Sequence, residues 1–250
     1  MVEYIGLEGS ATFAALADRF GVSQMTVYRD TQELEARGLV RRTRGGVTMQ
    51  PSIVFESNLR YRANLHQAEK QAIARRGAEF VEPGMSVMLD DGTTLLPMAP
   101  LLAERTPLTV ITNFVPLMTS LRDVPGIQLI MLGGTYQQRH ECFSGLLCAD
   151  MISQVRADLL FLSPSAVSDG QVLHQEEDMV ATKRAMMHSA ERRVLMVDRS
   201  KLGRRALRRV AAVEDFDQIV TDDSGTDDDL RHISDRGVPI TIAKVELSGH

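Results

Sequence analysis

The stretch VSQMTVYRDTQELEARGLVRRTRGG, residues 22–46, decides the architecture of the first part of the chain. Ser23 is a typical N-cap for a helix in which Val27, Thr31 and Leu34 share one face. The opposite face of this helix carries Met25, Tyr28, Arg29, Gln32 and Ala36. The helix leads into a segment in which four arginines follow one another with no acid between them: Arg37, Arg41, Arg42 and Arg44. This arrangement is typical of a surface that binds a polyanion.

The segments on either side predict a winged helix-turn-helix. Upstream, the helical spacing of Phe13, Leu16 and Phe20 predicts a helix that Thr12 caps and Gly21 ends. Downstream, residues 39–49 predict two short strands around a glycine turn. Two helices joined by a tight turn and followed by a β-wing form this motif, and the second helix is the recognition helix. Residues 1–9 provide only about one turn of the preceding helix, so we expect a truncated first helix.

The rest of the chain alternates between apolar, strand-like runs and helical segments. Strands are expected at 85–90, 108–112, 127–132, 158–163, 193–198, 216–221 and 238–243. Helices are expected at 94–104, 114–122, 143–155, 175–191 and 226–236. Such alternation predicts an α/β domain with a mostly parallel sheet that is covered on both faces. We therefore expect a winged helix-turn-helix over 1–50, a linker over 51–65 and an α/β effector domain over 66–250.

Composition restricts the class of protein. With 44% hydrophobic residues and two cysteines, no signal peptide and no apolar run that could span a membrane, the chain is expected to be cytoplasmic, with reduced thiols and no membrane partner. The net charge of −5 argues against nucleic-acid binding. However, arginines and acids balance within residues 1–50, so the excess of acids lies in the remainder. The arginine cluster can therefore still contact phosphates.

Polar and small residues follow several of the expected strands. In a parallel sheet the carboxyl ends of strands, next to helix N-termini, are where ligands bind. The segments at these ends are DDGTT (90–94), TN (112–113), GGTY (133–136) and DRSK (198–201). Together they suit an anionic, polyhydroxylated ligand such as a sugar phosphate, although a single segment of this kind is more often only a turn or a surface ion pair.

The sequence gives no indication of catalytic or metal chemistry. His140, Glu141 and Cys142 are contiguous and cannot easily converge on one metal, and His174 is distant in sequence. No Ser-His-Asp arrangement or nucleophile elbow is present. We therefore predict no catalytic residues, no metal and no cofactor.

The ordered motifs resemble those of the DeoR family of bacterial transcriptional regulators. The run VSQMTVYRD is similar to that family's DNA-binding signature, and LDDGTT, ITN, MLGG, DLLFLS, DRSKLG and IVTDD follow in the expected order. The resemblance implies an effector domain similar in fold to ribose-5-phosphate isomerase, which senses a phosphorylated sugar or related metabolite. It also implies a repressor of carbohydrate-metabolism genes rather than an enzyme.

The resemblance implies two sets of functional residues. The implied DNA-binding residues are Ser23, Gln24, Met25, Thr26, Tyr28, Arg29, Arg41, Arg42 and Arg44. The implied effector-binding residues are Asp90, Asp91, Gly92, Thr93, Thr94, Asn113, Gly133, Gly134 and Lys201. Asp91 stands where the family usually has Ser, and a carboxylate beside a phosphate site repels a dianion. Both a phosphorylated and an uncharged effector therefore remain open. Thr31 replaces a usual Leu and is expected to bury a hydroxyl.

Three hypotheses follow. The first is a regulator that binds double-stranded operator DNA as a homo-oligomer, a dimer or tetramer, on paired half-sites. The second is a sugar-phosphate isomerase or deaminase, for which Asp90, Asp91 and Asp169 are the candidate general bases, although no carboxylate pair at suggestive spacing accompanies them. The third is a sensor whose shortened first helix leaves the winged domain unfolded.

Overall fold

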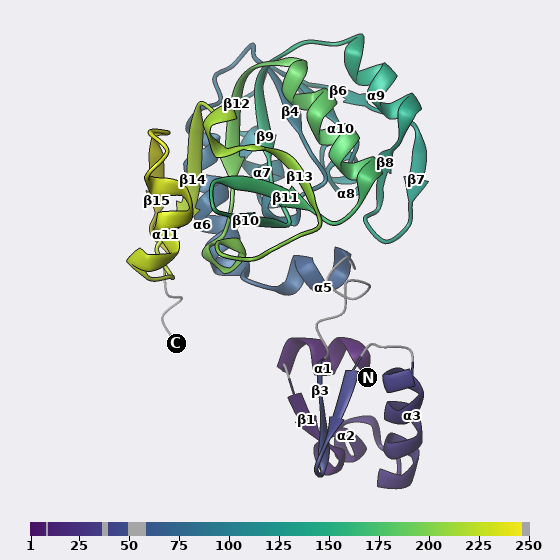
Figure 1. Ribbon diagram of the computed structural model, residues 1–250. Helices are drawn as coiled ribbons and strands as arrows, with labels where there is room; N and C mark the ends of the chain where they lie inside the picture. The colour runs from purple at the N-terminus through teal and green to yellow at the C-terminus, as the bar shows by residue number, and fades with distance from the viewer. Residues whose placement is uncertain (9, 37–39, 50–58, 247–250) are drawn as a thin grey trace. The chain divides into compact units, whose positions relative to one another are not determined.

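The structure, a computed structural model, describes residues 1–8, 10–36, 40–49 and 59–246 of the chain (Figure 1). It divides into two compact units, Met1–Leu65 and His66–His250. Among these residues, no helix has both the length and the apolar character needed to cross a membrane.

The first unit is a winged helix-turn-helix, as predicted. Its core consists of Ile5, Leu16, Val27, Val40 and Val47, each at most 1% exposed. The three strands form an antiparallel sheet in the order β1-β3-β2. The elements of this unit are α1 (Val2–Glu8), β1 (Ser10–Thr12), α2 (Phe13–Phe20), α3 (Gln24–Ala36), β2 (Val40–Thr43), β3 (Gly46–Met49) and α5 (Leu59–Asn64).

The predicted helix caps are confirmed. Thr12 Oγ1 accepts a hydrogen bond of 3.1 Å from the Ala15 N–H at the start of α2. Gly21 ends that helix in the left-handed conformation at φ 64°, which costs glycine little because it has no Cβ. Ser23 Oγ accepts the Thr26 N–H at 3.1 Å and so caps α3.

Three features at the edges of this unit differ from the sequence prediction. The expectation of only about one turn before Thr12 is wrong: helix α1 has 7 residues, about two turns, and supplies the fully buried Ile5 to the core. Strand β1, which was not predicted, pairs with β3 in the register Ser10↔Thr48 and Thr12↔Gly46. Part of the expected linker, residues 59–64, is helix α5, which contacts α1. Residues 50–58 and Arg37 lie outside the described residues.

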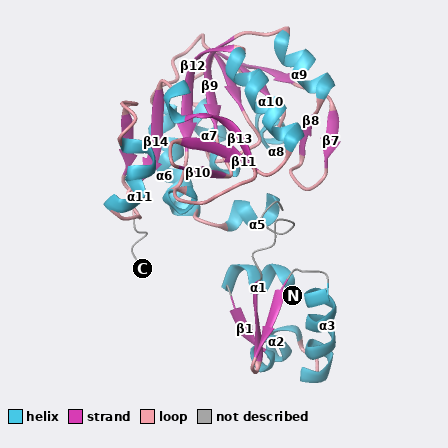
Figure 2. Ribbon diagram, in the orientation of Figure 1, coloured by secondary structure: helices cyan, strands magenta, loops and turns pink. Residues whose placement is uncertain are grey.

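The second unit is built on a parallel sheet of seven strands within the described range. All seven predicted strands are present, in the order β15-β14-β12-β9-β4-β5-β6, and every neighbouring pair is parallel. Figure 2 shows the strands of the chain in magenta and its helices in cyan. These strands are β4 (Ser86–Leu89), β5 (Leu108–Thr112), β6 (Ile127–Met131), β9 (Ala157–Leu162), β12 (Ala190–Met196), β14 (Gln218–Asp222) and β15 (Ile240–Ala243).

Helices lie on both faces of this sheet. One face packs against α6 (Gln67–Ala78), and α7 (Met98–Ala103) and α8 (Val115–Leu121) continue the layer. There Gly77 permits a close approach, since a Cβ on it would lie 2.6 Å from the Met196 side chain. The other face packs against α9 (Leu146–Ser153), α10 (Glu177–His188) and α11 (Asp227–Ser234) in one apolar cluster. The predicted helix over 94–104 is divided into a 3₁₀ turn, η1 (Thr93–Leu95), and α7.

Shorter elements that the sequence did not reveal complete the unit. A small antiparallel sheet has the order β10-β11-β13, and β7 and β8 form a hairpin. Their bounds, with two further 3₁₀ turns, are β7 (Thr135–Gln137), β8 (Cys142–Ser144), β10 (Ala166–Ser168), β11 (Gln171–His174), η2 (Arg199–Lys201), β13 (Arg208–Ala212) and η3 (Val213–Asp215).

The connections define the point at which a ligand is expected. From β4 the chain continues outward through β5 to β6, whereas from β9 it continues through β12 and β14 to the opposite edge. The direction of winding therefore reverses between β4 and β9. Crevices at such reversal points, beside the carboxyl ends of the strands, are the usual ligand sites of open α/β sheets.

Candidate DNA-binding surface and effector site

Helix α3 exposes the side chains predicted to read DNA. Met25 is 76% exposed, Tyr28 is 45% exposed, and Arg29 and Gln32 are also exposed. The inward face buries Val27 and Thr31 completely. Thr31 Oγ1 donates a 3.0 Å hydrogen bond to the Tyr28 carbonyl, so the hydroxyl expected to be buried has a partner. The remaining predicted residues at the start of the helix are exposed: Ser23, Gln24 and Thr26.

The arginines of the wing do not all face solvent. Alternation along β2 places Arg42 on the same face as the buried Val40, whereas Arg41 is exposed. The Arg42 Nε donates to Glu35 at 2.8 Å, and its backbone N–H donates to the same carboxylate at 2.8 Å. These contacts hold the pKa of Glu35 below its usual range.

The Arg42 guanidinium also lies 4.6 Å from the centre of the Tyr28 ring, which packs in a T-shaped arrangement with the Phe13 ring. Arg42 and one face of Tyr28 therefore hold the wing against α3. Arg41 in β2 and Arg44 in the turn remain the exposed arginines of the described wing.

In the second unit, Lys183 of α10 forms a buried ion cluster with two predicted effector residues. Its Nζ donates to Asp90 Oδ2 at 2.6 Å and to Asp91 Oδ1 at 2.8 Å. All three side chains are at most 2% exposed. The Asp91 carboxylate is therefore paired with an ammonium. This pairing weakens the repulsion of a phosphate dianion that the sequence led us to expect from Asp91. Lys183 was not predicted, although its place among the buried Met179, Val180, Met186 and Met187 of α10 was a detectable signal.

The two buried carboxyls share one ammonium, and their pKa values differ in the direction of their shifts. Burial raises the pKa of Asp90, and the attraction of Lys183 does not fully offset it. Burial also raises the pKa of Asp91, but the charge of Lys183, with smaller contributions from His174 and His140, outweighs it and lowers that pKa below its usual range. Burial opposes the charge of Lys183, yet the two carboxylates raise the pKa of this lysine above its ordinary value. The pKa values of the two carboxyls are therefore shifted in opposite directions, upward for Asp90 and downward for Asp91.

Lys201 joins this cluster to the end of β12. Its Nζ donates to Thr94 Oγ1 at 3.0 Å and to Ser163 Oγ at 3.1 Å, and it lies 3.3 Å from Asp198 Oδ2. Ser163, which follows β9, also donates its backbone N–H to Asp90 at 2.9 Å. Ser163 was not among the predicted site residues. One cation and two hydroxyls therefore meet where β4, β9 and β12 end.

The glycine of the first loop permits this close packing. A Cβ on Gly92 would lie 2.3 Å from the Ser163 Cβ, and the Gly92 N–H donates to Asp90 Oδ1 at 2.8 Å. The following Thr93 and Thr94 form η1 and are buried. The predicted residues from Asp90 to Thr94 are therefore brought together with Lys201.

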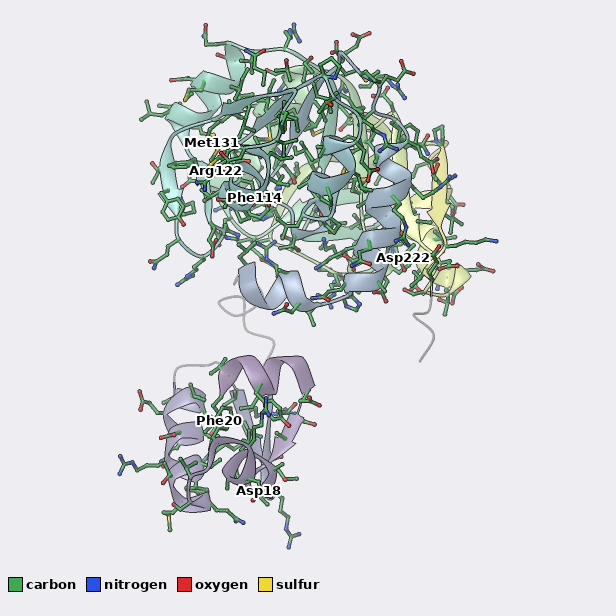
Figure 3. All side chains as sticks on the ribbon, turned by 180° about the vertical axis from the view of Figure 1, so that it is seen from behind. Asp18, Phe20, Phe114, Arg122, Met131 and Asp222 are labelled. Carbon is green, nitrogen blue, oxygen red and sulfur yellow. The ribbon has the colours of Figure 1, made fainter. Side chains whose placement is uncertain are left out.

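Asn113, Gly133 and Gly134 occupy the neighbouring strand ends. The fully buried Asn113 donates from Nδ2 to the Phe143 carbonyl at 2.7 Å, and its Oδ1 is buried without a hydrogen-bond partner in the described chain. The next residue in sequence, Phe114, is also fully buried and is labelled in Figure 3. The Gly133 N–H donates to the Met151 sulfur at 3.2 Å. Gly134, at φ 143°, packs on α9, since a Cβ there would lie 2.9 Å from the Cys148 Cβ. These three residues contact the β8–α9 segment rather than Lys201.

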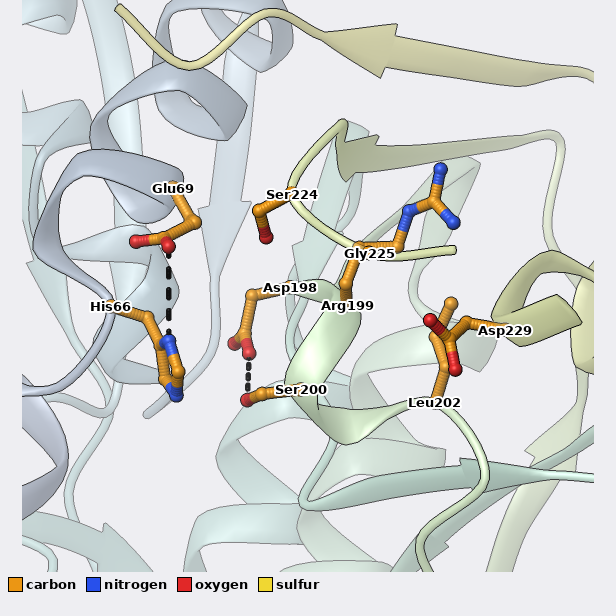
Figure 4. Close-up of a pocket in the computed structure, with 9 residues that line it drawn as sticks. All are labelled: His66, Glu69, Asp198, Arg199, Ser200, Leu202, Ser224, Gly225 and Asp229. Carbon is orange, nitrogen blue, oxygen red and sulfur yellow. Dashed lines mark hydrogen bonds and ion pairs between the residues drawn. The ribbon is translucent and has the colours of Figure 1, made fainter. Parts of the chain in front are cut away.

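Asp198, whose Oδ2 lies 3.3 Å from Lys201 Nζ, also lines a pocket of about 450 Å³ (Figure 4). The Ser200 hydroxyl donates to Asp198, and Ser224 donates to Asp222 beneath the pocket. The buried Arg199 donates to the backbone carbonyls of Asp222 and Thr226 at 2.7 and 2.8 Å. None of its lining residues is a predicted effector residue: His66, Glu69, Asp198, Arg199, Ser200, Leu202, Ser224, Gly225 and Asp229.

The histidines near the cluster are bound to protein groups. His140 Nε2 lies 3.0 Å from Glu176 Oε1, and His174 Nδ1 accepts the Glu176 N–H at 3.1 Å. Among the described residues, no group of three or more His, Cys, Asp or Glu side chains could hold a metal ion.

Comparison with known proteins identifies both units. Residues 1–52 match the DeoR-like helix-turn-helix domain, and residues 65–223 match the DeoR C terminal sensor domain. The uncharacterized HTH-type transcriptional regulator YgbI of Escherichia coli is 32% identical over 98% of this chain and 96% of its own length. The transcriptional repressor AccR of Agrobacterium fabrum is 33% identical over 90% of this chain and 88% of its own. The glycerol-3-phosphate regulon repressor of E. coli is 31% identical over 89% and 88%.

Similarity to solved structures is weaker. A D-ribose-5-phosphate isomerase aligns with 14% identity and a TM-score of 0.39 over 55% of this chain and 53% of the enzyme. The strand pairs given above establish the parallel sheet independently of this similarity. The matched families and the sequence relatives are regulators, so they support the regulator over the isomerase or deaminase hypothesis. The chain belongs to the DeoR family of transcriptional regulators, with a helix-turn-helix domain followed by a sensor domain.

Proposed function

We propose that the protein represses carbohydrate-metabolism genes by binding operator DNA and that a small phosphorylated sugar or polyol controls its affinity through Lys201. One observation carries this proposal: Lys201 contacts Thr94, Ser163 and Asp198 within 3.3 Å at the carboxyl ends of three strands. A single cation thus links a hydroxyl cluster to the wall of the adjoining pocket.

The two sides of Lys201 suit different parts of such a ligand. The ammonium and the hydroxyls of Thr94 and Ser163 can bind an anionic group. The pocket presents the carboxylates of Glu69, Asp198 and Asp229, which accept hydrogen bonds from sugar hydroxyls. The pairing of Asp91 with Lys183 removes much of the repulsion that an unpaired carboxylate would exert on a phosphate. The name of the glycerol-3-phosphate regulon repressor supports the same class of ligand.

On the DNA side, the exposed face of α3 and the wing are the proposed contacts. Gln24, Tyr28 and Arg29 would read base edges in the major groove, while Arg41 and Arg44 would bind the backbone. Because one winged helix reads few base pairs, we propose that the protein binds paired half-sites as at least a dimer.

A thermal-shift screen tests the effector proposal. The full chain is heated with glycerol 3-phosphate, pentose and hexose phosphates, and the matched free sugars, sugar acids and polyols. We expect one phosphorylated compound to raise the melting temperature by several degrees, since ligand at 100 times Kd contributes about 2.7 kcal/mol. Lys201→Met should lose this shift, whereas Lys244→Met, the same change at an exposed lysine, should keep it.

Two outcomes would contradict the proposal. Stabilisation by uncharged compounds alone would show that the effector carries no phosphate. An equal shift in wild type and Lys201→Met would show that the ligand binds elsewhere.

A further inference from the structure

Helix α9 exposes an apolar surface beside the β7–β8 hairpin. Leu146 is 78% exposed, Leu147 67% and Met151 42%, and Tyr136 of β7 is 48% exposed. Only Gly145 separates β8 from α9, and Tyr136 packs against Phe143 of β8 with ring centres 5.5 Å apart. We refer to Tyr136, Leu146, Leu147 and Met151 as the α9 face.

This concentration differs from the rest of the sensor domain. Within its described residues, the other exposed large apolar side chains are Leu207 and Ile242, on separate elements. Isolated exposed apolar residues are normal on protein surfaces. The α9 face exposes roughly 400 Å² of side chain, which is the size of the largest apolar patch on a typical monomer, and such a patch is often functional.

Helix α9 is apolar on its inner side as well. Cys148 and Ile152 are fully buried in the apolar cluster between the large sheet and its helices, where α9 packs against α10. Asp150 is its only charged residue. A helix that is apolar all round is normally buried on all sides. The outer side of α9 therefore lacks the cover that its composition requires.

We propose that a second copy of this chain covers the α9 face and that two sensor domains pair through it. In a two-fold interface the same patch meets itself, which an apolar surface without a concentrated charge of either sign permits. A standard interface buries about 800 Å² on each partner, somewhat more than half of it apolar. The α9 face supplies most of that apolar part, and paired DNA half-sites require such a dimer.

The α9 face also contacts a loop of the predicted effector site. The Met151 sulfur accepts the Gly133 N–H at 3.2 Å, and Gly134 packs directly on Cys148. A ligand that moves the Gly133-Gly134 loop would therefore move Met151 and change how the two copies meet. This consequence rests on the proposed effector function, whereas the pairing surface does not.

Leu147→Glu in the full chain tests the surface. Sedimentation equilibrium of the wild type should give twice the 27.7 kDa of one chain, or a larger assembly that the variant halves. Leu147→Glu should raise the dimer dissociation constant by about 100-fold or more, because it buries a charge at the centre of the contact. Leu207→Glu is the matched control, since Leu207 is 77% exposed outside the α9 face, and it should remain paired.

Leu146→Glu provides an independent second variant, and circular dichroism should show that both variants melt as the wild type does. A monomeric wild type at tens of micromolar would overturn the proposal, as would an unchanged mass in both α9 variants. Such a result would follow if another segment of the same chain covered the α9 face. Thermal shifts with the screened sugar phosphates on these samples separate the two proposals, because ligand binding can persist when the pairing surface is wrong.

Discussion

Replacing Lys183 by methionine should destabilise the sensor domain strongly. Methionine retains most of the apolar length of the side chain but removes the ammonium that contacts Asp90 at 2.6 Å and Asp91 at 2.8 Å. Both carboxylates are at most 2% exposed, so water cannot replace the lost partner. Removing one partner of a buried ion pair costs about 3–5 kcal/mol, because an uncompensated charge remains. For a domain of this size, this corresponds to a fall in melting temperature of roughly 6–20 °C.

Thermal unfolding followed by circular dichroism measures this effect. At pH 7, Lys244→Met should stay within about 2 °C of the wild type, because Lys244 is exposed. Adding Asp91→Asn to Lys183→Met should restore part of the loss by removing one of the unpaired charges. In Lys183→Met, burial without the ammonium raises the carboxylate pKa values above those of the unfolded chain. The deficit should therefore shrink as the pH falls from 7 to 5.

A Lys183→Met variant that melted within 2 °C of the wild type at pH 7 would refute the buried cluster. A deficit that grew toward pH 5 would refute the assignment of the unpaired charge to the carboxylates.

Three further predictions concern packing and the wing. Gly92→Ala should lower the free energy of unfolding in urea by about 1–3 kcal/mol, because the new Cβ would lie 2.3 Å from the Ser163 Cβ. Gly133→Ala should be tolerated, because its Cβ would lie 3.4 Å from the Met151 sulfur. Arg42→Ala should lower the melting temperature of the helix-turn-helix domain. Arg44→Ala should leave the melting temperature unchanged but reduce the salt dependence of DNA binding by about one phosphate contact. Equal melting temperatures of the two variants would contradict the structural role of Arg42. Burial raises the pKa of Cys148 to about 11, so both buried thiols should resist alkylation at pH 8 until the chain unfolds.

The fold was largely predictable because it depends on local patterns. The spacing of apolar residues predicts every strand of the large sheet, and Thr12, Gly21 and Ser23 identify helix ends through their own hydrogen bonds and backbone angles. The small antiparallel sheet was missed because its strands are short and one of them, β13, pairs with β11 more than 30 residues away.

The chemistry of the site was less predictable, because it depends on contacts between distant segments. Lys183 contacts carboxylates that lie 92 and 93 residues away in sequence, so nothing near Asp91 indicates that its charge is neutralised. Arg42 looked equivalent to Arg41 in the sequence. Alternation along β2, which places Arg42 with Val40, could have separated them.

The most direct test of the account is a titration of operator DNA, selected from genomic fragments that the full chain retains, with and without the compound that stabilises the protein. Fluorescence anisotropy would measure the affinity for wild type and for Lys201→Met. We predict that the compound changes wild-type affinity by at least about fivefold, the scale of ordinary coupling between sites. Lys201→Met should bind the DNA with wild-type affinity but should not respond. An affinity that the compound leaves unchanged, or changes equally in both proteins, would contradict control of DNA binding through the Lys201 site.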